Sequence, residues 1–155
     1  MAKSKKKGGG NSKEKARDPY MAFNFIVEIE GLTVGGFSEV TGLSSRIEME
    51  TYIEGGVNHR VHQFPKHMTY PNLVLMRGLA ERDDIWKWYE DATRGKIRLL
   101  NGTIMVRDSQ QSKLIGWNFK KAYPVAWDGP QLNASNGNEV AFERLELVHR
   151  GVYKA

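Results

Sequence analysis

Residues 117–149 (WNFKKAYPVAWDGPQLNASNGNEVAFERLELVH) constrain the fold more than any other stretch of the chain. They read as a strand, a kinked connection rich in Gly, Pro and Asn, and a second strand. The stretch carries no nucleophile motif, phosphate-binding loop or metal-ligand cluster. It therefore predicts strand packing and pairing rather than chemistry.

Two earlier stretches alternate apolar and polar residues with the period of two that marks a half-buried strand. In residues 21–31, one face carries Phe23, Phe25, Val27 and Ile29. In residues 46–54, Ile47 and Met49 alternate with Glu48 and Glu50. We expect the second strand to turn its apolar face inward and its acidic face outward.

One helix is expected, beginning after Asp83 as N-cap and ending at Gly95 as the residue after the C-cap. Glu90 and Arg94 form a supporting pair four residues apart. The apolar stripe that should face the core consists of Ile85, Trp88, Tyr89 and Ala92.

Further strand patterns occupy residues 70–79, 96–108, 114–123 and 140–148. In the last of these, the apolar residues skip a step, which predicts a bulge near Glu143 and Arg144. Residues 58–69 form a polar extended stretch interrupted by Pro65. The fold class is therefore mainly β: an antiparallel β-barrel or sandwich of about seven strands with one packed α-helix.

The net charge of +5 lies entirely in residues 1–20, which hold seven basic and two acidic groups. The remaining residues carry 16 of the 23 basic and 16 of the 18 acidic groups, so the body is neutral. We expect a basic, flexible N-terminal arm (residues 1–20) and one domain (residues 21–155). An alternative is a nucleic-acid-binding β-barrel module that uses this arm with Trp117 and Trp127, although such domains carry a basic face on the body.

Metal and redox chemistry find little support. A metal site could use His59, His62 and His67. However, His62 is separated from each of the other two by an odd number of residues, which places it on the opposite face of a strand. The chain has no cysteine, so it has no disulfide and no thiolate. No stretch approaches the roughly 18 apolar residues of a membrane span, so stable membrane insertion is not expected.

Hydrolytic chemistry is the third alternative, through Glu48, Glu50 and Glu54 on one strand face. The first two lie about 7 Å apart on a regular strand, within the range of glycosidase pairs. A general acid requires a desolvated site, which nothing nearby predicts. Ser44 and Ser45 lack the glycine-flanked nucleophile elbow. We expect no enzyme activity, catalytic residue, cofactor or metal site.

Taken block by block, residues 20–151 strongly resemble the tail-tube proteins of contractile phages and phage-tail-like contractile injection systems. The blocks that carry the resemblance are FNFIVEIEG, GGFSEVTGLSS, YIEGG, YPNLVLMRGL, DDIWKWYED, WNFKKAYPVAWDGPQLNA and NEVAFERLELVHRG. The resemblance implies hexameric rings that stack into a rigid hollow tube within a contractile sheath. The tube is driven through a target envelope and conducts cargo effectors or phage DNA.

As partners, the resemblance implies further copies of the chain, the sheath protein, and baseplate and tube-capping proteins. It implies assembly in the bacterial cytoplasm and release within a particle, and it fits a phage tail and an injection system equally. We expect Glu48 and Glu50 to face the lumen, and the N-terminal arm to contact a neighbouring subunit. The expected contacts between subunits or rings are Leu43, Ser44, Ser45, Tyr52, Glu54, Gly55, Gly56, Asn58, Glu139 and Glu143.

Overall fold

The computed structural model describes residues 24–32, 36–53, 61–79, 84–107, 113–132, 134–135 and 141–155. This part of the chain contains nine strands and one helix. In chain order they are β1 (Asn24–Ile29), β2 (Glu39–Thr41), β3 (Arg46–Ile53), β4 (Val61–Thr69), β5 (Leu73–Gly78), α1 (Asp84–Thr93), β6 (Leu100–Arg107), β7 (Lys113–Asp128), β8 (Phe142–Val148) and β9 (Val152–Lys154).

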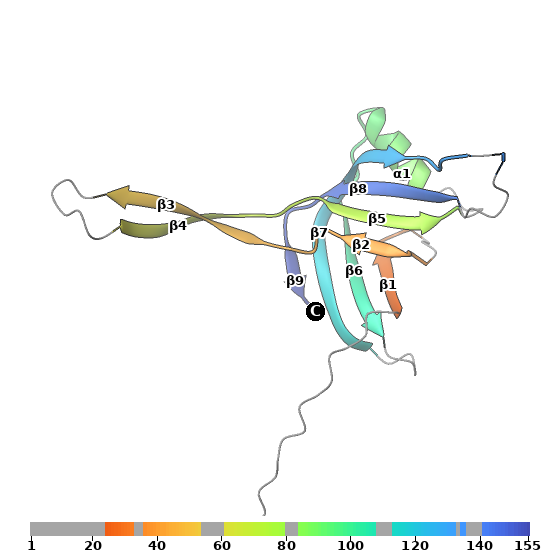
Figure 1. The fold of residues 1–155 in the computed structure, drawn as a ribbon. Coiled ribbons are helices and arrows are strands. Elements are labelled where there is room, and N and C mark those ends of the chain that lie inside the picture. The colour runs from red at the N-terminus through yellow and green to blue at the C-terminus, as the bar shows by residue number, and fades with distance from the viewer. Residues whose placement is uncertain are drawn as a thin grey trace, which may run out of the picture.

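Seven of these strands form one antiparallel sheet in the order β1-β6-β7-β8-β5-β2, with β9 also paired to β7. The 16-residue strand β7 belongs to both halves of this sheet: its first part pairs with β6 and β9, and its second part with β8. The two halves run across each other around β7 (Figure 1). The predicted mainly-β, antiparallel fold with one packed helix is confirmed.

Strand β7 changes direction at Lys121, which has a φ of 51°, in the left-handed region that side chains other than glycine rarely adopt. The side chain of Asn101 holds this point. Its Oδ1 accepts the backbone N–H of Lys121 at 3.1 Å, and its Nδ2 donates to Glu30 at 3.0 Å. The β6–β7 register shifts at the same place, so this bulge separates the two halves of the sheet.

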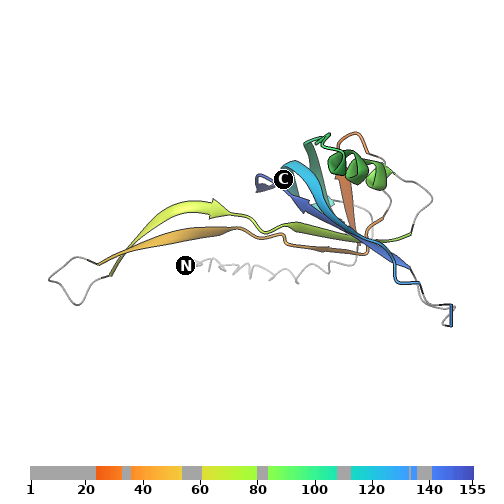
Figure 2. The same ribbon diagram turned by 90° about the horizontal axis from the view of Figure 1, so that it is seen from above.

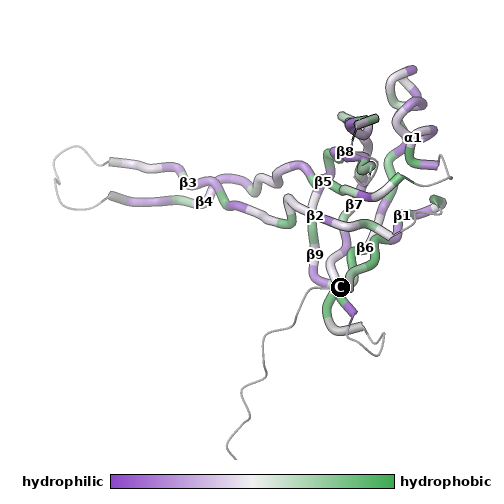
Figure 3. Tube along the Cα trace, turned by 45° about the vertical axis from the view of Figure 1, so that its right-hand side comes forward, coloured by the Kyte–Doolittle hydropathy of each residue, from purple (hydrophilic) through white to green (hydrophobic). Residues whose placement is uncertain are grey.

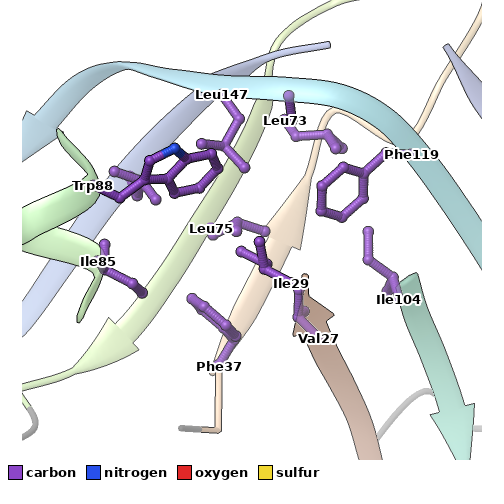
Figure 4. Packing of buried hydrophobic residues seen from close by; sticks show 12 residues of the cluster. Val27, Ile29, Phe37, Leu73, Leu75, Ile85, Trp88, Ile104, Phe119 and Leu147 are labelled. Atoms are coloured by element: carbon purple, nitrogen blue, oxygen red, sulfur yellow. The ribbon is translucent and has the colours of Figure 1, made fainter. Parts of the chain in front are cut away.

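The core lies between the two halves of the sheet and α1 (Figure 4). Trp88 and Phe119 are its largest fully buried side chains. The indole N–H of Trp88 donates to the carbonyl of Arg98 at 3.0 Å, so burial leaves this polar group satisfied. The other sheet residues of the core cluster are Val27, Ile29, Leu73, Leu75, Ile104, Ala122, Leu145 and Leu147.

Helix α1 follows the sequence prediction closely. Ile85 and Trp88 are buried, and Arg94 pairs with Glu90 at 2.7 Å. At the C-terminus, Gly95 has a φ of 81°. Its N–H donates to Ala92, while that of Lys96 donates to Asp91, which is the Schellman pattern. The expected N-cap, Asp83, lies outside the described residues.

The predicted bulge in β8 is wrong. Strand β8 pairs with β5 without interruption from Leu147 to Phe142, and the register shift lies on β7, between Pro124 and Ala126. The reason is that Glu143 occupies an inward position and Phe142 an outward one. The apolar residues therefore skip a step although the backbone does not.

The carboxylate of Glu143 is buried in an ion pair with Arg77 on the neighbouring strand β5. These two residues are only 8% and 4% exposed. The second carboxylate oxygen of Glu143 accepts the indole N–H of Trp127 at 3.0 Å. The ring of Trp127 in turn meets that of Trp86 edge-on, with centroids 4.6 Å apart, and so links β8 to α1.

Candidate assembly surface

Strands β3 and β4 form a two-stranded hairpin, called here the hairpin, that projects far from the body (Figures 1 and 2). Within the described residues, each of these strands pairs only with the other. Every described side chain from Arg46 to Tyr52 and from His62 to Met68 is exposed. An isolated two-stranded hairpin is marginally stable in water, so a surface that covers it would stabilise it.

A bulge in β4 determines which residues share a face of the hairpin. Met49 pairs with Pro65 and Ile47 with Met68, so three residues of β4 span the distance of two in β3. On a regular strand, Pro65 and Met68 would lie on opposite faces because they are three residues apart. The bulge thus gathers Ile47, Met49, Pro65 and Met68 on one face, called here the apolar face.

The apolar face of β3 was expected to point inward, and this is wrong for the subunit. Ile47, Met49 and Met68 are 53%, 49% and 52% exposed. Alternation fixes which side chains share a face, but it does not say what covers that face. In this chain the hairpin projects away from the body, so the core of the body does not cover the apolar face.

The opposite face of the hairpin carries Glu48, Glu50 and Tyr52. The carboxylate of Glu48 lies 3.8 Å from Nε2 of His67, with both side chains more than half exposed. Phe64 lies opposite Glu50 and stacks on His62. Apolar and acidic residues alternate along β3 from Ile47 to Glu50, whereas β4 has no regular alternation, and Figure 3 shows the hairpin as mainly hydrophilic.

The root of the hairpin contains three of the expected contact residues. Ser44 and Ser45 are exposed, and with Arg46 and the segment from Thr69 to Pro71 they line an open hollow of about 430 Å³. Leu43 is half-buried and packs against the core. Gly42, with a φ of 86°, packs so closely that an added Cβ would lie 2.0 Å from the Asn72 carbonyl oxygen.

The remaining candidates divide into three groups. Tyr52 is 58% exposed on the hairpin. Glu143 is buried against Arg77, so its expected role at the subunit surface is replaced by one inside the fold. Outside the described residues lie Glu54, Gly55, Gly56, Asn58 and Glu139.

The described residues contain no cluster of metal-binding side chains. Of the three histidines considered, His62 and His67 lie on β4 and His59 falls outside the described residues. Glu48 and Glu50 are exposed, whereas a general acid needs a desolvated carboxyl. No helix among these residues is long and apolar enough to cross a membrane.

Two structural residues, Arg77 and His149, were missed from the sequence. Both are buried at 4% and 7% exposure. Each continues a period-two series of buried leucines. Arg77 follows Leu73 and Leu75, and His149 follows Leu145 and Leu147. This spacing was the available signal that both side chains point inward, where a polar group must find a hydrogen-bond partner.

The fold is shared with parts of contractile machines. A chain of the anti-feeding prophage baseplate has a TM-score of 0.80 at 23% identity, covering 90% of this chain and 97% of that chain. A chain of the PVC sheath–tube complex, from an extracellular contractile injection system, has a TM-score of 0.81 at 20% identity, with coverages of 96% and 99%. Hcp1 from Flavobacterium johnsoniae has a TM-score of 0.52 at 11% identity, with coverages of 84% and 94%.

Comparison with curated protein sequences finds no match. The family model described as "T4-like virus tail tube protein gp19" matches residues 21–153, which is most of the chain. Neither this family nor the structures above support the alternative of a nucleic-acid-binding module. The chain therefore belongs to the T4-like virus tail tube protein family.

Proposed function

We propose that the chain is the repeating subunit of the inner tube of a contractile phage tail or injection system. Six copies form a ring, and the rings stack into a hollow tube. The single observation that carries this proposal, beside family membership, is the hairpin. It extends from the body and exposes an apolar face that none of the described residues covers.

A second copy of the chain is the covering surface. Large apolar side chains on a projecting element are costly in water, and each one fully buried contributes about 1.5–3 kcal/mol. When the same contact repeats around a ring and along a stack, the apolar face of every hairpin is covered by a neighbouring copy. The exposed residues Ser44 and Ser45 extend this contact at the root of the hairpin, and Tyr52 extends it at the far end of β3.

Glu48 and Glu50 line the lumen in this proposal. They share the face of the hairpin opposite the apolar one, so covering the apolar face leaves them free to meet solvent in the channel. The channel conducts cargo effectors or phage DNA, and the subunit itself has no catalytic role. Residues 21–155 form the tube domain, and the N-terminal arm contacts a neighbouring subunit.

The outer partners are the contractile sheath, the baseplate and a tube-capping protein. Similar chains come from structures described as a sheath–tube complex, a baseplate and a tube-terminating cap. The subunit is made and assembled in the bacterial cytoplasm, and the finished particle is released from the cell.

The test is electron microscopy and sedimentation of the full-length protein, comparing wild type with Ile47→Glu. The wild type should form rings or hollow tubes. The variant should stay unassembled, since assembly would bury an unpaired carboxylate, while its circular dichroism remains that of a folded protein. The matched control is Lys66→Gln, which makes the same change of net charge on the hairpin outside the apolar face. Tubes formed equally well by Ile47→Glu, or a wild type that stays monomeric at high concentration, would refute the proposal.

A further inference from the structure

His149 follows β8 and is 7% exposed, and both of its ring nitrogens have hydrogen-bond partners. Nδ1 accepts the backbone N–H of Gly151 at 3.2 Å, and Nε2 lies 3.0 Å from the carbonyl oxygen of Pro71. A backbone N–H can only donate and a carbonyl oxygen can only accept. These partners assign a neutral ring, with its proton on Nε2.

The two partners belong to different parts of the molecule. Pro71 lies in the short link between β4 and β5, where the hairpin joins the body. Gly151 lies between β8 and β9, and its carbonyl accepts the backbone N–H of Lys120 on β7 at 3.2 Å. His149 therefore ties the root of the hairpin to the sheet.

The contact extends from the link into the hairpin itself. The ring of Tyr70 packs against His149, with centroids 5.7 Å apart. The hydroxyl of Tyr70 lies 3.7 Å from the sulfur of Met68, on the apolar face. A change at His149 therefore reaches the assembly surface through one intervening side chain.

We propose that His149 is an acid-sensitive latch that fixes the hairpin root while neutral and releases it when protonated. Protonation places a second N–H on Nδ1, where it faces the N–H of Gly151, and two donors cannot share a hydrogen bond. The proposal rests on the proposed function only in taking the hairpin as the assembly element.

Three residues near the ring of His149 are titratable or charged. The titratable side chain that packs on it is Tyr70, from the link. The nearest cationic residues along the backbone network are Lys120 on β7 and Arg150 beside the ring, which hydrogen-bond to each other through main-chain atoms. Among the contacts of the described residues, His149 has no carboxylate partner.

The sign of the pH effect follows from proton linkage. The ring of His149 carries one nitrogen-bound proton in the latched state and two in the released state, so acid favours release. Uptake of one proton on release raises the equilibrium for opening about tenfold for each unit by which the pH falls.

The experiment uses full-length protein and two mass-spectrometric readouts between pH 8 and pH 5. Exchange of the ring carbon hydrogen reports the protonation of each histidine. Amide exchange, corrected for its intrinsic pH dependence, reports opening at Asn72, Leu73 and Gly151. We expect protection at these amides to fall about tenfold per pH unit as His149 gains its proton.

Two variants separate titration from packing. His149→Gln can retain a donor toward Pro71, and His149→Asn can retain an acceptor toward Gly151, but neither titrates in this range. Both should lose the pH dependence. His67→Gln is the matched control and should keep it, because His67 is exposed on the hairpin.

An unchanged pH response in both variants of His149, or protonation of the ring without loss of protection, would overturn the latch. If the variants do not fold, the wild type still decides, because ring protonation and amide opening must share one midpoint. Microscopy tests the proposed function separately. A pH response without tubes would support the latch and refute the tube. Tubes without a pH response would support the tube and refute the latch.

Discussion

The buried pair of Arg77 and Glu143 gives the most quantitative prediction. Replacing Arg77 by Met keeps the length of the apolar stem but removes its charge, which leaves the 8%-exposed carboxylate of Glu143 with the indole N–H of Trp127 as its neutral partner. Removing one member of a buried ion pair costs about 3–5 kcal/mol. We expect Arg77→Met to lower the free energy of unfolding by about that amount.

Neutralising both residues should recover much of this loss. In the double variant Arg77→Met, Glu143→Gln, the amide oxygen can still accept the indole N–H of Trp127, and no unpaired charge remains. Replacing a whole buried pair is often nearly neutral, so the double variant should be more stable than Arg77→Met alone.

Urea denaturation of wild type, both single variants and the double variant closes a double-mutant cycle. Since each single substitution should cost about 3–5 kcal/mol and the double variant should be more stable than Arg77→Met alone, the interaction energy should exceed about 3 kcal/mol. Additivity within about 0.5 kcal/mol would refute the reasoning, because it would mean that neither side chain depends on the charge of the other.

Three further predictions concern the backbone and the channel. Lys121→Gly should leave stability unchanged or raise it by up to about 1 kcal/mol in thermal unfolding, because glycine adopts a φ of 51° without strain; a clear loss would argue against the kink. Gly42→Ala should destabilise the fold by more than about 1 kcal/mol in the same assay, since the new methyl group meets the Asn72 carbonyl; an unchanged midpoint would contradict this close packing. Glu50→Gln should leave tube formation intact in micrographs and reduce retention of a cationic probe inside washed tubes; equal retention would remove Glu50 from the lumen.

Local signals in the sequence predict much of the body. Gly95 ends α1 because only a residue tolerant of positive φ fits there, and the stripe of Ile85 and Trp88 places the buried face of the helix. In β1, Val27 and Ile29 alternate as expected and both enter the core. Periodicity and capping are local, so a single sequence contains them.

The residues that the sequence misplaces depend on distant partners. The sequence alone predicts Glu143 to be a surface group, because its partner Arg77 lies on another strand, 66 residues away in the chain. The alternating pattern predicts that the apolar face of the hairpin lies in the core. Alternation does not show whether a strand points into the body or away from it. Met68 joins that face only through a bulge next to Pro65, and this proline marks an irregular strand without showing how its register shifts. These features arise from tertiary pairing, which propensity does not encode.

Strand β7 gives the body a mechanical property. Its single backbone runs through both halves of the sheet, joined on one side to β6 and β9 and on the other to β8. A load applied to the half that contains β9 therefore passes along the backbone of β7, and from there across the backbone hydrogen bonds of the ladder to β8 and β5. Because β5 leads directly back to Pro71, the same load arrives at the base of the hairpin. The subunit thus has a continuous path of backbone and ladder hydrogen bonds from the half of the sheet that contains β9 to the base of the hairpin.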